Sequence, residues 1–351
     1  MKTFYIISGC LGVAVIVVTA ILCHPAFGRK PSKERLARIE QSPNYHEGMF
    51  HNQIPTPQFT GEKGAFRTMW KFLFSGSTER IPKSPIETVK TDLQAFDTDR
   101  DRLVWFGHSS YMFCLNGKIF LIDPVLNLEF PSSLMLRPFA GTDIYKAEDL
   151  PDIDYLILTH EHWDHLDYGT LRQLRGKTHQ VICPLGVGEY MEYWGYKKEQ
   201  LAELDWGEMF NDSGVCIHCL PSRHFSNRLF SSNQTLWASF MVQSGGRQVY
   251  VGGDGGYDMR FKHIYERFGE ADLVIMENGQ YNRDWANIHM MPDDLEKAIL
   301  DLHAKQVFTV HHDKFALARH AWYEPDSVSR AIAERDSITL LDNKIGSVVY
   351  F

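Results

Sequence analysis

The sequence is short of positive charge and of cysteine. Its 351 residues carry 36 Lys and Arg against 44 Asp and Glu, which gives a formal net charge of −8 at pH 7. Nucleic-acid-binding proteins need a basic surface, so this balance argues against a nucleic-acid partner. Only four of the six cysteines lie after residue 23, and their spacing does not resemble a disulfide framework. No internal repeat is present, which excludes a solenoid architecture.

Charge is missing altogether from residues 3–23. These 21 residues, TFYIISGCLGVAVIVVTAILC, would form a helix of about 31 Å, enough for one bilayer crossing. Two interpretations stay open: an uncleaved membrane anchor, which we favour, and a signal peptide cut after Gly28, which would send the protein to the periplasm. Basic residues follow the segment in excess of those before it, so the anchor interpretation predicts a cytoplasmic catalytic domain.

Three regions are predicted along the chain. Residues 1–28 form the anchor or signal segment, residues 29–100 an N-terminal extension that packs on the catalytic domain, and residues 101–351 that domain. The extension contains an aromatic-rich piece, FRTMWKFLF at 66–74, for which core packing is favoured over an amphipathic helix on a membrane surface. From residue 103 onward, short apolar strands alternate with helical patterns, which predicts an α/β domain.

A cluster of potential metal ligands follows the strand predicted at 153–158. The stretch LTHEHWDHLD contains His160, His162, Asp164 and His165. The first two would point to one side of an extended chain but about 200° apart on a helix, so they belong on a loop, with the other two at the start of the next helix. Imidazole and carboxylate are ligands of zinc and related metals. The helical H-E-x-x-H motif is excluded, because Asp164 stands where it requires its second histidine.

H-x-H-x-D-H after a strand resembles the signature of the metallo-β-lactamase fold, an αββα sandwich with a dinuclear metal site at one edge. The resemblance implies three further ligands at later strand ends. CIHCLPSRHF supplies His224, VYVGGDGGYD supplies Asp254, and VFTVHHDKFAL supplies His311, with His312 as the competing choice. WFGHSSYMF, IFLIDPVL and HMMPDD narrow the resemblance to the branch containing N-acylphosphatidylethanolamine-hydrolysing phospholipase D and its bacterial relatives.

The resemblance also implies a division of the ligands between two divalent metal ions, with zinc favoured. One ion would be held by His160, His162 and His224. The other would be held by Asp164, His165 and His311, and Asp254 would bridge the pair. The implied catalytic residues are Asp164, Asp254 and His289.

Three residues near these ligands have alternative interpretations. Asp123, in LIDP, would orient the histidine loop from behind, or it forms an ordinary Asp-Pro turn. His289, in HMMPDD, would contact phosphate or transfer a proton, or it is a capping or structural histidine. His108, in GHSS, is expected to form a structural turn near the site.

The function that the resemblance implies is a dinuclear metal-dependent hydrolase. The leading case is a phosphodiesterase of phospholipase D type acting on N-acylphosphatidylethanolamine-like phospholipids, with membrane contact through residues 3–23. A lactone, a cyclic phosphodiester or a β-lactam is the alternative substrate. Redox di-iron proteins of this fold form a different class. Their motif resembles H-x-E-x-D, where this chain reads His160-Glu161-His162. They also usually carry a flavin domain, for which there is no room here.

Overall fold

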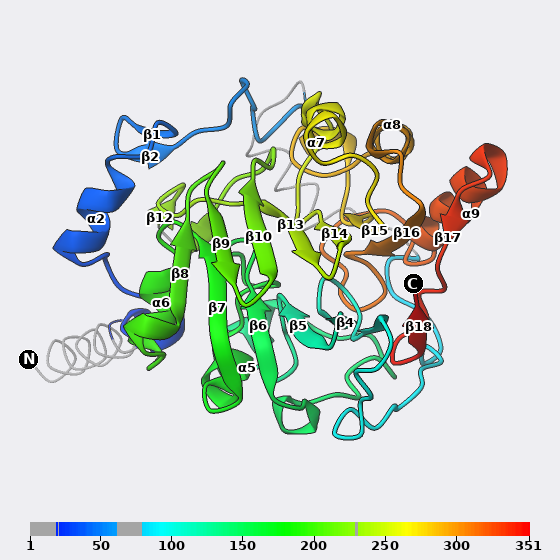
Figure 1. Ribbon diagram of the computed structural model, residues 1–351, viewed down its shortest axis with the longest axis horizontal. Helices are drawn as coiled ribbons and strands as arrows, with labels where there is room; N and C mark the ends of the chain where they lie inside the picture. Colours follow the sequence, from blue (N-terminus) through cyan, green and yellow to red (C-terminus); the bar gives the residue numbers. More distant parts are fainter. Residues whose placement is uncertain (1–18, 20, 62–78, 229–230) are drawn as a thin grey trace, which may run out of the picture.

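Two seven-stranded sheets pack face to face, and helices cover the outer face of each (Figure 1). The computed structural model describes residues 19, 21–61, 79–228 and 231–351. The predicted αββα sandwich is therefore confirmed as an architecture.

The two sheets share one pairing pattern, in which three antiparallel pairs are followed by three parallel pairs. In spatial order, the first sheet contains β18 (Val348–Tyr350), β3 (Arg102–Trp105), β4 (Tyr111–Leu115), β5 (Lys118–Ile122), β6 (Ile153–Ile157), β7 (Thr178–Pro184) and β8 (Leu201–Leu204). The second, from its antiparallel end, contains β9 (Met209–Asp212), β10 (Val215–Leu220), β13 (Ser239–Ser244), β14 (Arg247–Val251), β15 (Leu273–Glu277), β16 (Gln306–Val310) and β17 (Thr339–Leu340).

The remaining elements are helices and two small hairpins. The hairpins pair β1 (Tyr45–His46) with β2 (Met49–Phe50) and β11 (Asn227–Arg228) with β12 (Ser231–Ser232). The α-helices are α2 (Lys33–Ile39), α4 (Ser132–Met135), α5 (Tyr168–Leu174), α6 (Gly188–Tyr193), α7 (Arg260–Phe268), α8 (Pro292–Leu302) and α9 (Glu324–Asp336). The 3-10 helices are η1 (Pro25–Phe27), η2 (Ala147–Asp149), η3 (Lys198–Gln200) and η4 (Arg283–Trp285).

The strands are apolar on both faces because both faces are buried. In β4, Phe113 points into the core between the sheets, whereas its neighbour Met112 points to the outer layer with α5 and α6. Phe113 stacks on Phe120 of β5 with ring centroids 4.8 Å apart. On the second sheet, α8 contributes Leu295 and Leu302 to the outer layer, which follows from helical spacing of its apolar residues.

The N-terminal extension lies against the sandwich. Arg35 of α2 forms ion pairs with Glu189 of α6 and, at 2.6 Å, with Glu203 of β8. Phe50 of β2 is fully buried in a cluster with Trp237. These contacts agree with an extension that packs on the rest of the chain, although the boundaries at residues 28 and 100 stay a prediction. The aromatic piece at 66–74 lies outside the described residues.

The predicted localisation has to be corrected. In the ranges that the structure describes, no helix is long and apolar enough to cross a bilayer. This finding contradicts the prediction of a membrane-anchored protein with a cytoplasmic catalytic domain, and the N-terminal hydrophobic helix is not confirmed. Most of the predicted segment, residues 3–18 and 20, lies outside the described residues.

Candidate metal centre

The predicted ligands follow the carboxyl ends of strands in both sheets. The loop after β6 carries the four ligands of the histidine cluster, while His224 follows β10, Asp254 follows β14 and His311 follows β16. Parallel strands present their carboxyl ends at one edge of a sheet, which is the usual place for a site in such folds. The seven side chains are thereby brought to one edge of the sandwich.

The histidine loop has its own internal structure. The carbonyl of His162 accepts hydrogen bonds from the N–H groups of His165, at 3.1 Å, and Leu166, at 2.9 Å. Asp164 and His165 therefore lie in a turn, and the prediction that they stand at the start of a helix is wrong. Helix α5 begins only at residue 168 because Asp167 caps it, accepting a hydrogen bond from the N–H of Thr170 at 2.9 Å.

One group of candidate ligands comprises three histidines and an aspartate. His162 Nδ1 lies 2.9 Å from His160 Nε2 and 3.2 Å from His224 Nε2. Asp254 Oδ2 lies 3.8 Å from both His160 Nε2 and His224 Nε2. The four ligand atoms lie within 4.8 Å of one another, close enough to surround one ion.

A second group adjoins the first across Asp254. His165 Nε2 lies 3.2 Å from Asp254 Oδ2 and 3.6 Å from Asp164 Oδ2, and His311 Nδ1 lies 3.3 Å from Asp254 Oδ1. Ligand atoms of Asp164, His165, His311 and, in addition, His108 lie within 4.8 Å of one another. Asp254 thus stands between two groups, as the predicted bridging role requires.

Burial favours the neutral, metal-binding form in three of these imidazoles, whereas the carboxylates of Asp254, Asp164 and Asp123 raise the pKa of His165. Burial lowers the pKa of His160, His224 and His311 well below the ordinary value, so their rings are neutral. Among the described residues, the buried Nε2 of His311 has no hydrogen-bond partner. A buried polar atom without a partner is costly unless something else satisfies it. The donor set of imidazoles and carboxylates therefore fits one or two divalent metal ions.

Asp123 lies behind the histidine loop. Its Oδ2 is 2.8 Å from His165 Nδ1, and its Oδ1 accepts a hydrogen bond from the N–H of Thr159 at 2.8 Å. Asp123 has a left-handed φ of 40°, and His108 and His311 have φ values of 54° and 73°. Non-glycine residues rarely adopt this conformation, and such residues concentrate at functional sites.

His108 and His312 occupy distinct places. His108 exchanges backbone hydrogen bonds with the turn after β16, as expected of a structural turn, and its Nε2 also lies 2.8 Å from Asp164 Oδ2. His312 turns away from the ligand groups: its Nε2 lies 3.4 Å from Asn343 Nδ2, and its ring centroid is 4.9 Å from that of Trp105. The positions favour His311 over His312 as the ligand.

His289 forms a pair with Glu277, a residue that sequence reasoning missed. His289 Nδ1 lies 2.8 Å from Glu277 Oε2, while Glu277 Oε1 accepts a hydrogen bond from the N–H of Gly255 at 2.6 Å. Burial raises the pKa of Glu277 to about 7. Burial lowers the pKa of His289, but the carboxylates of Glu277, Asp254 and Asp164 raise it, and the net direction is upward. An acidic residue at the end of the apolar run LVIME was the available signal.

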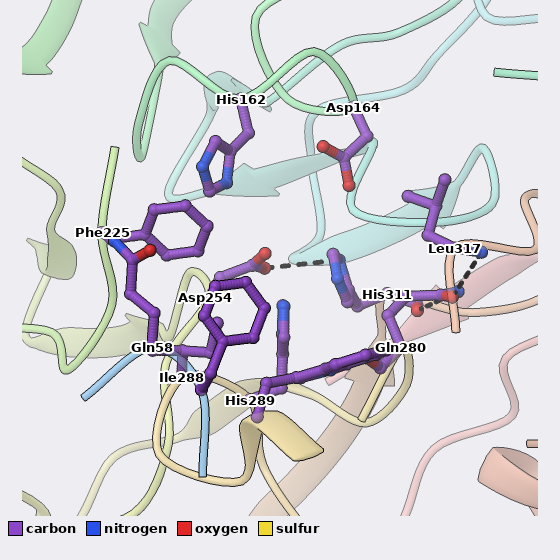
Figure 2. Close-up of a pocket in the computed structure, with 12 residues that line it drawn as sticks. Gln58, His162, Asp164, Phe225, Asp254, Gln280, Ile288, His289, His311 and Leu317 are labelled. Atoms are coloured by element: carbon purple, nitrogen blue, oxygen red, sulfur yellow. Dashed lines mark hydrogen bonds and ion pairs between the residues drawn. The ribbon is translucent and has the colours of Figure 1, made fainter. Parts of the chain in front are cut away.

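A cavity of about 250 Å³ opens over these groups (Figure 2). His162 and Asp164 point into it from the histidine loop, with Asp254, His289 and His311 on the opposite side. Much of the remaining wall is apolar and is formed by Phe59, Phe225, Trp285, Ile288 and Leu317. The centre therefore faces a pocket that is polar at one end and apolar around it.

Comparisons with known proteins agree with this architecture. Residues 118–312 match the profile described as beta-lactamase superfamily domain. An uncharacterized protein of Mycobacterium bovis is 34% identical over 307 residues, covering 86% of this chain and 82% of its own length. N-acyl-phosphatidylethanolamine-hydrolyzing phospholipase D 1 of Caenorhabditis elegans is 30% identical over 254 residues, covering 67% of this chain and 70% of its own.

Solved structures agree on the fold. The metallo hydrolase Igni18 of Ignicoccus hospitalis superimposes with a TM-score of 0.55 at 18% identity, over 72% of this chain and 98% of its own. With the profile match, the relatives and the clustered ligands, the chain belongs to the metallo-β-lactamase fold family and is a metal-dependent hydrolase of that superfamily.

Proposed function

We propose that the protein is a dinuclear phosphodiesterase of phospholipase D type that acts on N-acylphosphatidylethanolamine-like phospholipids. The position of Asp254 between two groups of candidate ligands carries the dinuclear part of the proposal. The relative from Caenorhabditis elegans supports the choice of substrate.

The first group of residues would hold one ion and the second group the other, with Asp254 shared. Bound divalent ions would lower the pKa of a water molecule and neutralise charge on the phosphoryl group. Asp123, through its contact with His165, would keep that ring in one orientation.

His289 is suited to protonate the leaving oxygen. It lines the cavity, and its Nδ1 is held by Glu277, which leaves Nε2 as the nitrogen available to substrate. Water adds to phosphorus and loses a proton to solvent, the bond to the amino-alcohol oxygen breaks, and that oxygen takes a proton from Nε2, which solvent then restores. The products would be phosphatidic acid and an N-acylethanolamine.

The apolar wall supports a lipid substrate. Phe225, Ile288 and Leu317 line the cavity over the centre, so an acyl chain attached near the phosphodiester would contact hydrocarbon rather than water. A small, fully polar substrate would leave this surface exposed.

The test is hydrolysis by the purified, metal-loaded protein. The enzyme is incubated with N-acylphosphatidylethanolamine in mixed micelles, and the products are identified by mass. We expect phosphatidic acid to be released, and to disappear in His160→Ala. If no phospholipid is turned over while the same preparation opens a lactone, cyclic phosphodiester or β-lactam, the lipid assignment is replaced by that substrate.

A further inference from the structure

Residues 52–60 of the N-terminal extension, which we call the strap, run from β2 across the molecule toward α7 (Figure 1). The strap lies outside residues 118–312, which match the family profile. It nevertheless contacts the candidate metal centre and forms part of the cavity wall.

Asn52, at the start of the strap, hydrogen-bonds to the backbone of a predicted metal ligand. Its Nδ2 donates to the carbonyl of His224 at 2.7 Å, and its Oδ1 accepts from the N–H of His224 at 3.1 Å. The same oxygen accepts a hydrogen bond from Trp237 Nε1 at 3.1 Å. One amide thus satisfies both backbone groups of His224, a residue 172 positions away.

These hydrogen bonds cannot be replaced easily. His224 is fully buried, so its backbone N–H and C=O groups could not hydrogen-bond to water if the Asn52 amide were removed. Trp237 Nε1 would keep its second acceptor, the carbonyl of Ser222 at 2.9 Å. The loss would therefore fall on the peptide groups that set the position of the His224 ring.

The rest of the strap is fastened to the loops around the cavity. Asn287 Nδ2 donates to the carbonyl of Pro57 at 3.0 Å, and Thr60 Oγ1 donates to the carbonyl of Arg283 at 2.6 Å. The N–H of Thr60 donates to the carbonyl of Asp284 at 2.8 Å. Between these fixed points, residues 58 and 59 are held in one place.

Gln58 and Phe59 face the cavity from this position. Figure 2 shows Gln58 beside Phe225. Within the described part of the chain, the Gln58 side chain makes no hydrogen bond, so its amide is available to a ligand. Phe59 extends the apolar wall and is still 38% exposed.

We propose that the strap contributes directly to the active site, by positioning a metal ligand and by contacting the substrate. Asn52 is a positioning residue for His224, and Gln58 with Phe59 selects substrates that carry an amide or hydroxyl group followed by a hydrocarbon chain. The second half rests on the proposed function, because it places the acylated leaving group of the phosphodiester against the strap. The first half depends only on metal binding.

The metal arm of the test compares Asn52→Ala with Asn44→Ala. Asn44 belongs to the same extension, and its side chain hydrogen-bonds to Asp205 at 3.2 Å without touching the candidate ligands. Zinc affinity is measured by competition with a chromogenic chelator, alongside thermal unfolding. We expect Asn52→Ala to bind zinc about 10–100-fold more weakly and Asn44→Ala to bind it as the wild type does. The positioning role would be overturned if Asn52→Ala bound zinc as tightly as the wild type, or if both variants lost the same amount of zinc affinity.

The substrate arm measures kcat/KM for phosphodiesters that differ only in the length of the acyl chain on the leaving amino alcohol. We expect Phe59→Ala to reduce the preference for the long chain about tenfold, and Gln58→Ala to raise KM for both chains, with zinc content unchanged. Unchanged kcat/KM in both variants would overturn the selecting role. If the wild type hydrolyses no phospholipid, the proposed function fails. The same variants are then measured on the substrate that the enzyme does hydrolyse. The metal arm still tests the positioning role of Asn52.

Discussion

Asp123 Oδ2 lies 2.8 Å from His165 Nδ1 and accepts a hydrogen bond from Thr159 Oγ1 at 2.5 Å. The contact fixes the His165 ring so that its other nitrogen faces Asp254. Residues that orient metal ligands in this way contribute to affinity without touching the ion.

Asp123→Asn should therefore weaken metal binding about 10–100-fold while the protein still folds. The amide keeps the size of the side chain but loses the negative charge that holds His165 Nδ1–H and makes the other ring nitrogen a stronger metal ligand. The measurement is chelator competition, with the surface substitution Asp143→Asn as the control. If Asp123→Asn bound metal with wild-type affinity, Asp123 would have only the role of a residue in an ordinary Asp-Pro turn.

Metal content should be about two ions per chain, since Asp254 stands between the first and second ligand groups described above. Asp254→Ala should lose much of the second ion together with the activity. Elemental analysis of wild type and variant gives the stoichiometry. A preparation that contains no transition metal, and gains no activity when any is added, is incompatible with this expectation.

His311→Ala should abolish turnover, whereas His312→Ala should only reduce it. His311 lines the cavity, while His312 packs against Trp105 and Asn343 outside the ligand groups. Turnover is measured at saturating metal, with circular dichroism to show that both variants fold. The reverse result would mean that the assignment is off by one residue.

His289→Ala should lower kcat about 10²–10⁴-fold, the usual contribution of a positioned acid or base. Zinc content should be unchanged if His289 acts on the leaving group rather than on the ions. The exposed His263→Ala serves as the control. A loss of zinc equal to the loss of activity would make His289 a ligand instead.

Lys314 should give the protein a pH-dependent stability. Its ammonium group is buried and donates hydrogen bonds to the carbonyls of Phe106, at 3.2 Å, and Val125, at 2.9 Å. Burial lowers its pKa from 10.5 to about 8. Between these pH values the unfolded chain keeps a proton that the folded chain has lost, so this residue raises the free energy of unfolding by about 3 kcal/mol as pH increases.

The measurement is urea unfolding of wild type and Lys314→Met at several pH values from below 8 to above 10. Lys314→Met should show a smaller rise in unfolding free energy than the wild type over this range. Lys262→Met, at an exposed position, should follow the wild type. Parallel curves for wild type and Lys314→Met would contradict the depressed pKa.

Much of the fold could be predicted because burial leaves a clear pattern in the sequence. Apolar runs such as IDYLI and LVIME became central strands, and the spacing in PDDLEKAILDL became α8. The strands LAEL and MFND, β8 and β9, were missed because they lie at or near sheet edges, where polar residues are tolerated. The membrane-anchored localisation was wrong, because no helix among the residues that the structure describes is long and apolar enough to cross a bilayer.

The site was predictable only where a motif marks it. The ligands of the histidine loop lie within a stretch of six residues, and they point to metal by residue type alone. Glu277 and Asn52 belong to no such motif: Glu277 is marked only by its place at the end of the run LVIME, and a single asparagine is ordinary anywhere in a chain. Their roles arise from contacts between segments far apart in the sequence, such as Asn52 with His224. Geometry of this kind can be read only from the folded chain.

The candidate ligands are divided between the two layers of the sandwich. His160, His162, Asp164 and His165 follow β6 of one sheet, whereas His224, Asp254 and His311 follow strands of the other. Metal held by both sets would cross-link the layers much as a disulfide would, so its binding free energy would also be free energy of folding. Chelation should then lower the melting temperature as well as the activity, and the seam between the sheets is where the fold would open first.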